Sequence, residues 1–323
     1  PLYSSAASDV YKRQLHKELG VVTEVFKTNE SLSLEGNVGI GHVRYPTAGC
    51  SDVSEAQPFH SSNPVNICLA HNGTLTNSDE MKKFLLDTHF CQFNTQSDSE
   101  VLLNLFAYEL SKTNFAVLQN SHVFEALKRV YERCEGGFAV TMIVGGVGLV
   151  AFRDANGIRP LVVGKKDDES FMVASESSAL SALGYEFEYD IDPGTAVVIS
   201  ESGVVEKSIC SESISHSPCL FEFVYFSRPD SVIDSISVHK SRLRMGDFLG
   251  DKILKDYSHL EIDAVIPVPD TSRTSAMQVA YKLGVKYREG FIKNRYIGRT
   301  FIMPGQSIRT VSYTHLTLPT NRE

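Results

Sequence analysis

The first part of the chain combines strand-like apolar runs with helix-like ones. Runs of β-branched and apolar residues between turn residues predict strands at residues 38–45 and 65–71. Asn72-Gly73, directly after the second run, predicts a tight turn. Apolar residues at helical spacing predict three helices, which begin at Asn77-Ser78 (with Met81, Phe84 and Leu85 on one face), at Ser97 (with Glu100 as a capping box) and near Phe124 (with Leu127 and Val130).

Between residues 136 and 199 the pattern changes to short strands. Short apolar segments alternate with Gly, Asp, Asn and Pro, and one short helix is predicted at residues 175–183. Helices followed by such a strand-rich stretch favour an α+β arrangement, with layers of helix and sheet, over a doubly wound sheet.

A second unit is predicted to begin between Glu206 and Pro218, with the boundary placed at 207/208. Its pattern is a helix at 237–255, a buried strand at 264–269, a polar loop and a helix at 274–283. Strand, polar loop and helix in this order indicate an α/β domain that binds a phosphate or nucleotide beyond the end of the strand. The pattern stops soon after Arg309, too early to complete such a sheet.

Composition narrows the possible functions. The 323 residues are 42% hydrophobic and 22% charged, with net charge -8, which is typical of a globular protein of about two domains. The sequence has no basic stripe of the kind that would indicate a nucleic acid as a partner. The longest apolar stretch, residues 137–152, is broken by glycines and predicts two strands around a turn instead of a membrane span. Six cysteines without a CxxC pair, and no secretory signal, favour reduced thiols in a cytoplasmic protein.

Three segments carry residues that could bind a small molecule. Arg44 ends a predicted strand, where its guanidinium could hold a carboxylate through two hydrogen bonds. The Asn72 side chain and the Gly73 backbone N–H could donate to one developing oxyanion. Asp98 could accept hydrogen bonds from a substrate ammonium. Taken singly, each also has a structural explanation: an ion pair for Arg44, a hairpin turn for Asn72-Gly73, and a favourable helix N-terminus for Asp98.

A fourth segment, residues 293–306, is basic and aromatic. It contains Lys293, Arg295 and Arg299 together with Tyr296. A solvated loop would explain this composition, and a mobile lid that closes on a polyphosphate is the alternative.

The order of the motifs closely resembles the amidophosphoribosyltransferase family, the glutamine phosphoribosylpyrophosphate amidotransferases. The segments that carry the resemblance are GIGHVRYPTAG, EAQPF, LAHNGTLTN, TQSDSE, FRDANGIRPLVVG, VASES, FEFVYFSRPDS, VIPVPDTS and KNRYIGRTFIMPGQ. They cover nearly everything from Leu15 to Arg309. HNG and an arginine-bearing strand recur in many class II glutamine amidotransferases, whereas FSRPDS with NRYIGRTF points to this family.

The resemblance implies an enzyme that transfers glutamine-derived ammonia to 5-phosphoribosyl-1-pyrophosphate, giving 5-phosphoribosylamine, glutamate and pyrophosphate in the first step of purine synthesis. It implies a glutaminase domain at 15–207, with the αββα sandwich of N-terminal-nucleophile hydrolases. Arg44 would then hold the α-carboxylate of glutamine and Asp98 its α-ammonium. Asn72 and Gly73 would form the oxyanion hole.

The resemblance also implies an incomplete type I phosphoribosyltransferase domain, of the α/β class, at 208–310. Thr271 would lie at the Mg²⁺ and phosphoribosyl site. The flexible loop that closes over the donor and encloses an ammonia channel would include Lys293, Arg295, Tyr296 and Arg299. Purine nucleotides would be inhibitors, and the full-length enzyme would form a homo-oligomer such as a tetramer.

The chain departs from the family pattern at both ends. The family's nucleophilic Cys stands at the mature N-terminus, and an acidic stretch similar to VDDSIVRGTT follows the flexible loop; neither is in this sequence. We therefore expect neither glutaminase nor synthase activity from this chain. Residues 1–14 and 311–323 resemble translated adapter sequence, and we expect them to be foreign.

Three further points stay open at the level of sequence. Cys219 lies near the place of one ligand of the iron–sulfur cluster that one branch of the family carries, although a buried free Cys is the simpler interpretation. Another class II amidotransferase, such as a glucosamine-phosphate synthase or an asparagine synthetase, would lack VIPVPDTS and NRYIGRTF. A non-catalytic nucleotide-binding homologue is the other alternative.

Overall fold

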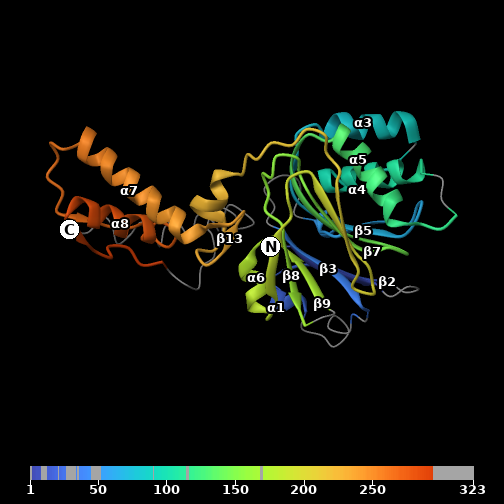
Figure 1. Ribbon diagram of the computed structural model, residues 1–323, viewed down its shortest axis with the longest axis horizontal. Helices are drawn as coiled ribbons and strands as arrows, with labels where there is room; N and C mark the ends of the chain where they lie inside the picture. Colours follow the sequence, from blue (N-terminus) through green and yellow to red (C-terminus); the bar gives the residue numbers. More distant parts are fainter. Residues whose placement is uncertain are drawn as a thin grey trace. The chain divides into compact units, whose positions relative to one another are not determined.

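The computed structural model describes residues 2–8, 13–20, 22–26, 34, 36–44, 52–89, 91–113, 116–167 and 170–293. The chain forms two compact units, Pro1–Cys219 and Leu220–Glu323 (Figure 1). The division falls later than the predicted boundary at 207/208. The reason is that residues 205–209 pair with the sheet of the first unit, and Ser215 N–H then donates to Ala155 O at 3.1 Å.

A six-stranded antiparallel sheet is the centre of the first unit. Its order is β12-β11-β7-β6-β5-β4, with β12 at Val205–Ile209, β11 at Thr195–Ile199, β7 at Gly148–Arg153, β6 at Gly136–Val144, β5 at Ile67–Leu75 and β4 at Phe59–Ser61. The predicted glycine turn after residue 144 joins β6 to β7. Successive side chains of a strand point to opposite faces of a sheet, and β6 shows this in its core contacts. Val140 and Met142 pack in one hydrophobic cluster, whereas Ala139 and Ile143 pack in two others.

Helices cover one face of this sheet (Figure 1). They are α3 (Ser78–His89), α4 (Asp98–Ser111) and α5 (Asn120–Arg133). The predicted apolar face of the first helix is confirmed, because Met81 and Leu85 are buried in the core and Phe84 packs against it. This cluster is the largest apolar core of the unit, and it fixes the N-terminus of α4 against β5.

Smaller sheets pack on the opposite face. One has the order β10-β8-β9, with β10 at Glu186–Asp190, β8 at Val162–Lys166 and β9 at Ser170–Ala174. The other has the order β2-β1-β3, with β2 at Arg13–Leu19, β1 at Leu2–Ser8 and β3 at Val38–Arg44. Short helices α1 (Val22–Val25) and α6 (Ser177–Ala182) complete this side. The predicted layering of helix, sheet, sheet and helix is confirmed. Residues 2–8, predicted to be foreign, form β1, and that origin stays a prediction.

Two local predictions were wrong. Asn72-Gly73 does not form a turn: both residues lie inside β5, which runs on to Leu75. Gly73 has a φ of +152°, and a Cβ built there would be 2.0 Å from Gly137 O, so the glycine permits β5 and β6 to run very close together.

The predicted capping box of Ser97 and Glu100 does not form. Ser97 caps α4 by accepting from Ser99 N–H, but the Glu100 carboxylate binds the loop before the helix.

The second unit begins with η2 (Glu222–Phe226), a short π-helix, and a hairpin of β13 (Val232–Ile233) and β14 (Ile236–Ser237). The two predicted helices are confirmed as α7 (Val238–Asp256) and α8 (Arg273–Leu283). Strand β15 (Ala264–Val265) pairs in parallel with β16 (Lys286–Tyr287) around α8, which is an α/β unit.

The strand predicted at 264–269 is much shorter than expected. Val268 is 69% exposed, so the prediction of a fully buried strand was wrong. Parallel strands are buried when other strands and helices cover them, and among the described residues β16 is the only strand beside β15. In the described part of the chain, no helix has both the length and the apolar character that a bilayer crossing requires.

Candidate functional site

Asn72 and Gly73 lie near the end of β5, where the strand becomes accessible. The residue before them, His71, is buried, whereas Gly73 is exposed. Gln57 holds the backbone of His71 from both sides: its Oε1 accepts from His71 N–H at 2.6 Å, and its Nε2 donates to His71 O at 3.0 Å. This buried pair of hydrogen bonds fixes the strand just before the predicted oxyanion donors.

Asp98 lies beside the same strand. Its Oδ2 accepts a hydrogen bond from the Leu75 N–H at 2.9 Å, and its Oδ1 is 3.8 Å from Nδ1 of His71. The Asp98 side chain remains 23% exposed, so it can still meet a ligand. Burial lowers the pKa of His71, against the attraction of Asp98, so the imidazole is neutral at pH 7. The neutral ring leaves the carboxylate charge available for a cation.

Glu55 joins the predicted arginine to the loop before α4. It is the last residue of the 3₁₀ helix η1 (Val53–Glu55), and it is buried. Its Oε2 is 3.8 Å from Nη1 of Arg44, and its backbone carbonyl accepts from the same nitrogen at 3.3 Å. Its Oε1 accepts from the Gln96 N–H at 2.9 Å. The end of β3 and the start of α4 are therefore held together.

The loop before α4 owes its shape to Glu100. The two carboxylate oxygens accept from the backbone N–H groups of Asn94 and Thr95 at 2.9 and 2.8 Å, and from the Thr95 hydroxyl at 2.7 Å. These hydrogen bonds supply the partners that the backbone of an irregular loop would otherwise lack.

Arg159 is a site residue that the sequence analysis missed. Its Nη2 donates to Oδ1 of Asn72 at 2.8 Å, across 87 positions in the chain. Arg159 belongs to the FRDANGIRPLVVG segment, which carried the family resemblance without any assigned role. That membership was the signal that could have drawn attention to it.

His42 lies two residues before Arg44 in β3. Burial, together with the neighbouring His71 and Arg44, lowers the pKa of His42 to about 4.

The four residues are complementary in charge and hydrogen bonding to an amino acid with a carboxamide side chain. Arg44 supplies a cation, Asp98 an anion, and Asn72 with Gly73 two neutral donors. Hydrogen bonds of Glu55 with Arg44 and Gln96, and of Asp98 with Leu75, connect the elements that carry them, and His71 lies 3.8 Å from Asp98. Such a set can hold a carboxylate, an ammonium and a polarised amide oxygen at once.

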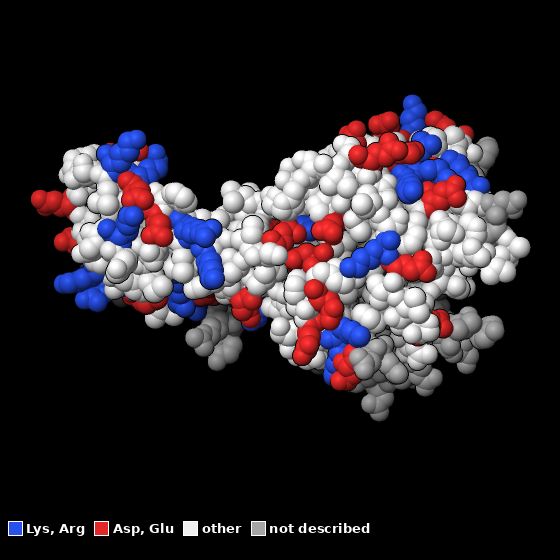
Figure 2. Space-filling model, viewed as in Figure 1, with Lys and Arg blue, Asp and Glu red and all other residues white. Residues whose placement is uncertain are grey.

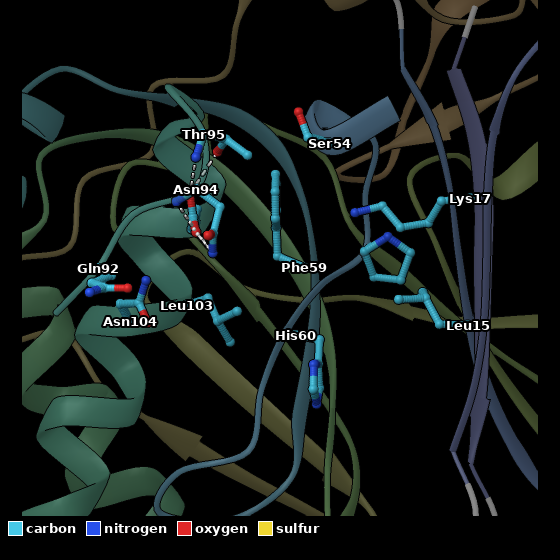
Figure 3. Close-up of a pocket in the computed structure, with 12 residues that line it drawn as sticks. Leu15, Lys17, Ser54, Phe59, His60, Gln92, Asn94, Thr95, Leu103 and Asn104 are labelled. Carbon is cyan, nitrogen blue, oxygen red and sulfur yellow. Dashed lines mark hydrogen bonds between the residues drawn. The ribbon is translucent and has the colours of Figure 1, made fainter. Parts of the chain in front are cut away.

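A cavity of about 450 Å³ lies next to this arrangement (Figure 3). Figure 3 shows Lys17 of β2 on one side and Asn94 and Thr95 on the other, with Phe59 between them. None of the four predicted residues lines this cavity, so the expectation of one pocket formed by all four is not met by it. Asp98 is held beside β5 by its hydrogen bond with Leu75, and Glu55 links Arg44 to the loop before α4.

The predicted residues of the second unit are only partly described. Lys293 Nζ is 3.3 Å from Asp270 Oδ2, directly before Thr271, and Arg273 Nη1 is 3.7 Å from the other oxygen of Asp270. Arg295, Tyr296 and Arg299 lie outside the described residues. Arg273 Nη2 also lies 3.4 Å from Glu289 Oε2, so both cations have carboxylate partners.

The described residues do not by themselves fit a divalent cation. No group of three or more His, Cys, Asp or Glu side chains that could hold a metal occurs among them, whether at Thr271 or at Cys219. Mg²⁺ usually takes one or two protein carboxylates and completes its shell with substrate phosphates and water. Cys219 is a free thiol, and its backbone N–H donates to Ile158 O at 3.3 Å.

On the face that Figure 2 shows, the described Lys and Arg side chains lie among Asp and Glu side chains and form no continuous basic strip.

Comparison with known proteins agrees with this fold. A family model described as a glutamine amidotransferase domain matches residues 42–182, which include Arg44, Asn72, Gly73 and Asp98. The fold and this match therefore define a glutamine amidotransferase domain. Two curated amidophosphoribosyltransferases extend the match to most of the chain. The one from Pseudomonas aeruginosa is 51% identical over 304 residues, 93% of this chain and 61% of that protein. The one from Escherichia coli is 50% identical over 303 residues, with 93% and 60% covered.

Solved structures give the same result. Glutamine phosphoribosylpyrophosphate amidotransferase from B. subtilis, complexed with ADP and GMP, matches with a TM-score of 0.79 at 34% identity, over 96% of this chain and 64% of that one. A structure described as the allosteric regulatory enzyme of purine biosynthesis matches with a TM-score of 0.81 at 35% identity, over 96% and 63%. The chain belongs to the amidophosphoribosyltransferase family. It spans about three-fifths of the length of the curated relatives named above.

Proposed function

We propose that this chain contributes the glutamine-binding domain, and the first part of a phosphoribosyltransferase domain, to an amidophosphoribosyltransferase. That activity transfers ammonia from glutamine to 5-phosphoribosyl-1-pyrophosphate. The observation that carries the proposal is that Asp98 is hydrogen-bonded to Leu75 beside Asn72 and Gly73 near the end of β5, while Glu55 links Arg44 to the loop before Asp98. The names of the relatives support the particular reaction.

In this proposal the four residues bind three different groups of glutamine. The Arg44 guanidinium holds the α-carboxylate, and the Asp98 carboxylate holds the α-ammonium. Asn72 Nδ2 and the Gly73 N–H then donate to the side-chain oxygen, whose negative charge grows as a nucleophile attacks the amide carbon. The exposed face of Gly73 leaves its backbone accessible to that oxygen.

The second unit is proposed to receive the phosphorylated donor. Lys293 and Arg273, close to Asp270 and Thr271, supply positive charge for a pyrophosphate. Arg295, Tyr296 and Arg299 are proposed to belong to the loop that closes over the donor. Mg²⁺ is proposed to enter with the donor phosphates. Purine nucleotide inhibition, a homo-oligomeric full-length enzyme and a cytoplasmic location complete the proposal.

The test is binding of L-glutamine to this chain, measured by calorimetry. We expect saturable binding below about 10 mM, since enzyme KM values usually lie between 1 μM and 1 mM. Arg44→Met and Asp98→Asn should weaken it strongly, whereas Lys112→Met, on the far end of α4, should not. L-Glutamine that binds no better than D-glutamine would refute the proposal. A non-catalytic nucleotide-binding role would instead predict binding of purine nucleotides without binding of glutamine.

A further inference from the structure

The Arg159–Asn72 contact determines which way the Asn72 amide points. An arginine side chain carries donors and no acceptor, so it can satisfy only the oxygen of an amide. Since Nη2 of Arg159 lies 2.8 Å from Asn72 Oδ1, the Asn72 NH₂ group must face the other way. We propose that Arg159 is a positioning residue that holds the Asn72 amide with its two N–H donors toward the glutamine carboxamide. This inference rests on the proposed function of Asn72.

The backbone of Arg159 is held from both sides. Its N–H donates to Oδ2 of Asp154 at 3.1 Å, and its carbonyl accepts from Nε of Arg153 at 2.6 Å. Arg153 and Asp154 are 1% and 0% exposed, so the two charged side chains that hold Arg159 are shielded from water. The guanidinium of Arg159 therefore extends from a fixed base.

The remaining hydrogen bonds of this pair also go to the backbone. Asp154 accepts from the N–H groups of Phe138, Asn156 and Ile158 at 3.2, 3.0 and 2.9 Å. Arg153 donates to the carbonyls of Ile191 and Gly157 at 3.0 and 2.8 Å. Buried charges with this many partners are costly to displace, so these hydrogen bonds stabilise the loop.

The fixed amide matters because an asparagine can present either end to a ligand. If the Asn72 amide turned over, its oxygen would face the developing oxyanion and would repel it. Donors that already point at the oxyanion need no reorganisation during the reaction, which is the basis of this kind of catalysis. The positive charge of Arg159 lies close enough to lower the pKa of His71, and it adds to the positive potential at the site.

The experiment is NMR on the ¹⁵N-labelled chain, with the Asn72 side-chain NH₂ signals assigned by their loss in Asn72→Asp. L-Glutamine should shift these signals in the unaltered chain. Arg159→Lys, which keeps only donors, should retain the shift. Arg159→Met should lose it, while the glutamine Kd changes by less than about threefold, because Arg44 and Asp98 still hold the amino acid. A purely structural role would move Kd and the melting temperature together.

Each result is informative. Retention of the full shift in Arg159→Met would overturn the inference. If the unaltered chain binds no glutamine, the proposed function fails, and the Asn72 signals of the ligand-free chain test the inference instead. Arg159→Met should then move these signals toward those of an exposed, freely turning Asn. Unchanged signals would refute the inference. Should Arg159→Met fail to fold, Arg159→Gln replaces it. The side-chain amide introduced at position 159 can either donate to Asn72 or accept from it. Two sets of Asn72 signals are therefore expected, and a single unshifted set would count against the inference.

Discussion

The buried carboxylate of Glu55 contacts both Arg44, at 3.8 Å, and the backbone N–H of Gln96, at 2.9 Å. One side chain thus ties the residue proposed to hold the α-carboxylate to the loop that leads to Asp98, proposed to hold the α-ammonium. The separation of these two charges decides which amino acids fit.

Replacing Glu55 should therefore weaken glutamine binding without touching the ligand. We expect Glu55→Ala to raise the Kd by about tenfold, or about 1.4 kcal/mol, because the carboxylate that contacts both Arg44 and Gln96 is lost and only the backbone carbonyl of residue 55 still accepts from Arg44. Glu55→Gln keeps an oxygen for Gln96 and should cost less. Calorimetry with L-glutamine measures both, and equal affinity of Glu55→Ala and the unaltered chain would contradict the explanation.

Gly73 should be irreplaceable for reasons of space. In Gly73→Ala the new methyl would lie 2.0 Å from Gly137 O, and the backbone cannot give way without breaking the β5–β6 pairing. Overpacking and an unfavourable φ together should cost about 3 kcal/mol or more. Gly146→Ala is the matched control, because Gly146 also has positive φ, +81°, but nothing lies within 4 Å of the added carbon. Urea unfolding compares the two, and equal costs would exclude the steric argument.

His42 should make the first unit less stable in mild acid. Its pKa is about 4 in the folded chain and 6.5 in the unfolded one, so the unfolded state binds the proton first as the pH falls. The stabilisation is complete above pH 6.5 and is lost between pH 6.5 and 4, by at most about 1.4 kcal/mol per pH unit for one group. The lowered pKa of His71 acts in the same direction.

Urea unfolding at several pH values checks this dependence. His42→Asn should reduce the slope of stability against pH in that window. His60→Gln removes an exposed imidazole of the same unit and should leave the slope unchanged. An identical slope in His42→Asn and the unaltered chain would show that His42 is not responsible.

Asp154 should be important for stability and for the site together. Asp154→Asn keeps the shape but turns an NH₂ group toward backbone donors, which should cost about 3 kcal/mol. Because Asp154 also holds the N–H of Arg159, the Asn72 signals should change as well. Asp79→Asn, at an exposed position in the first turn of α3, should cost less than about 1 kcal/mol. A comparable loss in both variants would contradict a special role for Asp154.

The sequence by itself determined the elements with a strong local period. Helices α3, α5, α7 and α8 and the β6–β7 hairpin follow from apolar spacing and turn residues, which are properties of neighbouring positions. The motif order also pointed to the family, and with it to Arg44, Asn72, Gly73 and Asp98.

Only the tertiary structure decided how these residues are supported. Asn72-Gly73 has the local signature of a turn, but close pairing with β6 keeps it in a strand. Glu100 fits a capping box by spacing, yet the loop before α4 offers it better donors. Arg159 reaches Asn72 from 87 positions away. Contacts of this kind depend on how sheets and loops pack in three dimensions, and local periodicity carries no information about them.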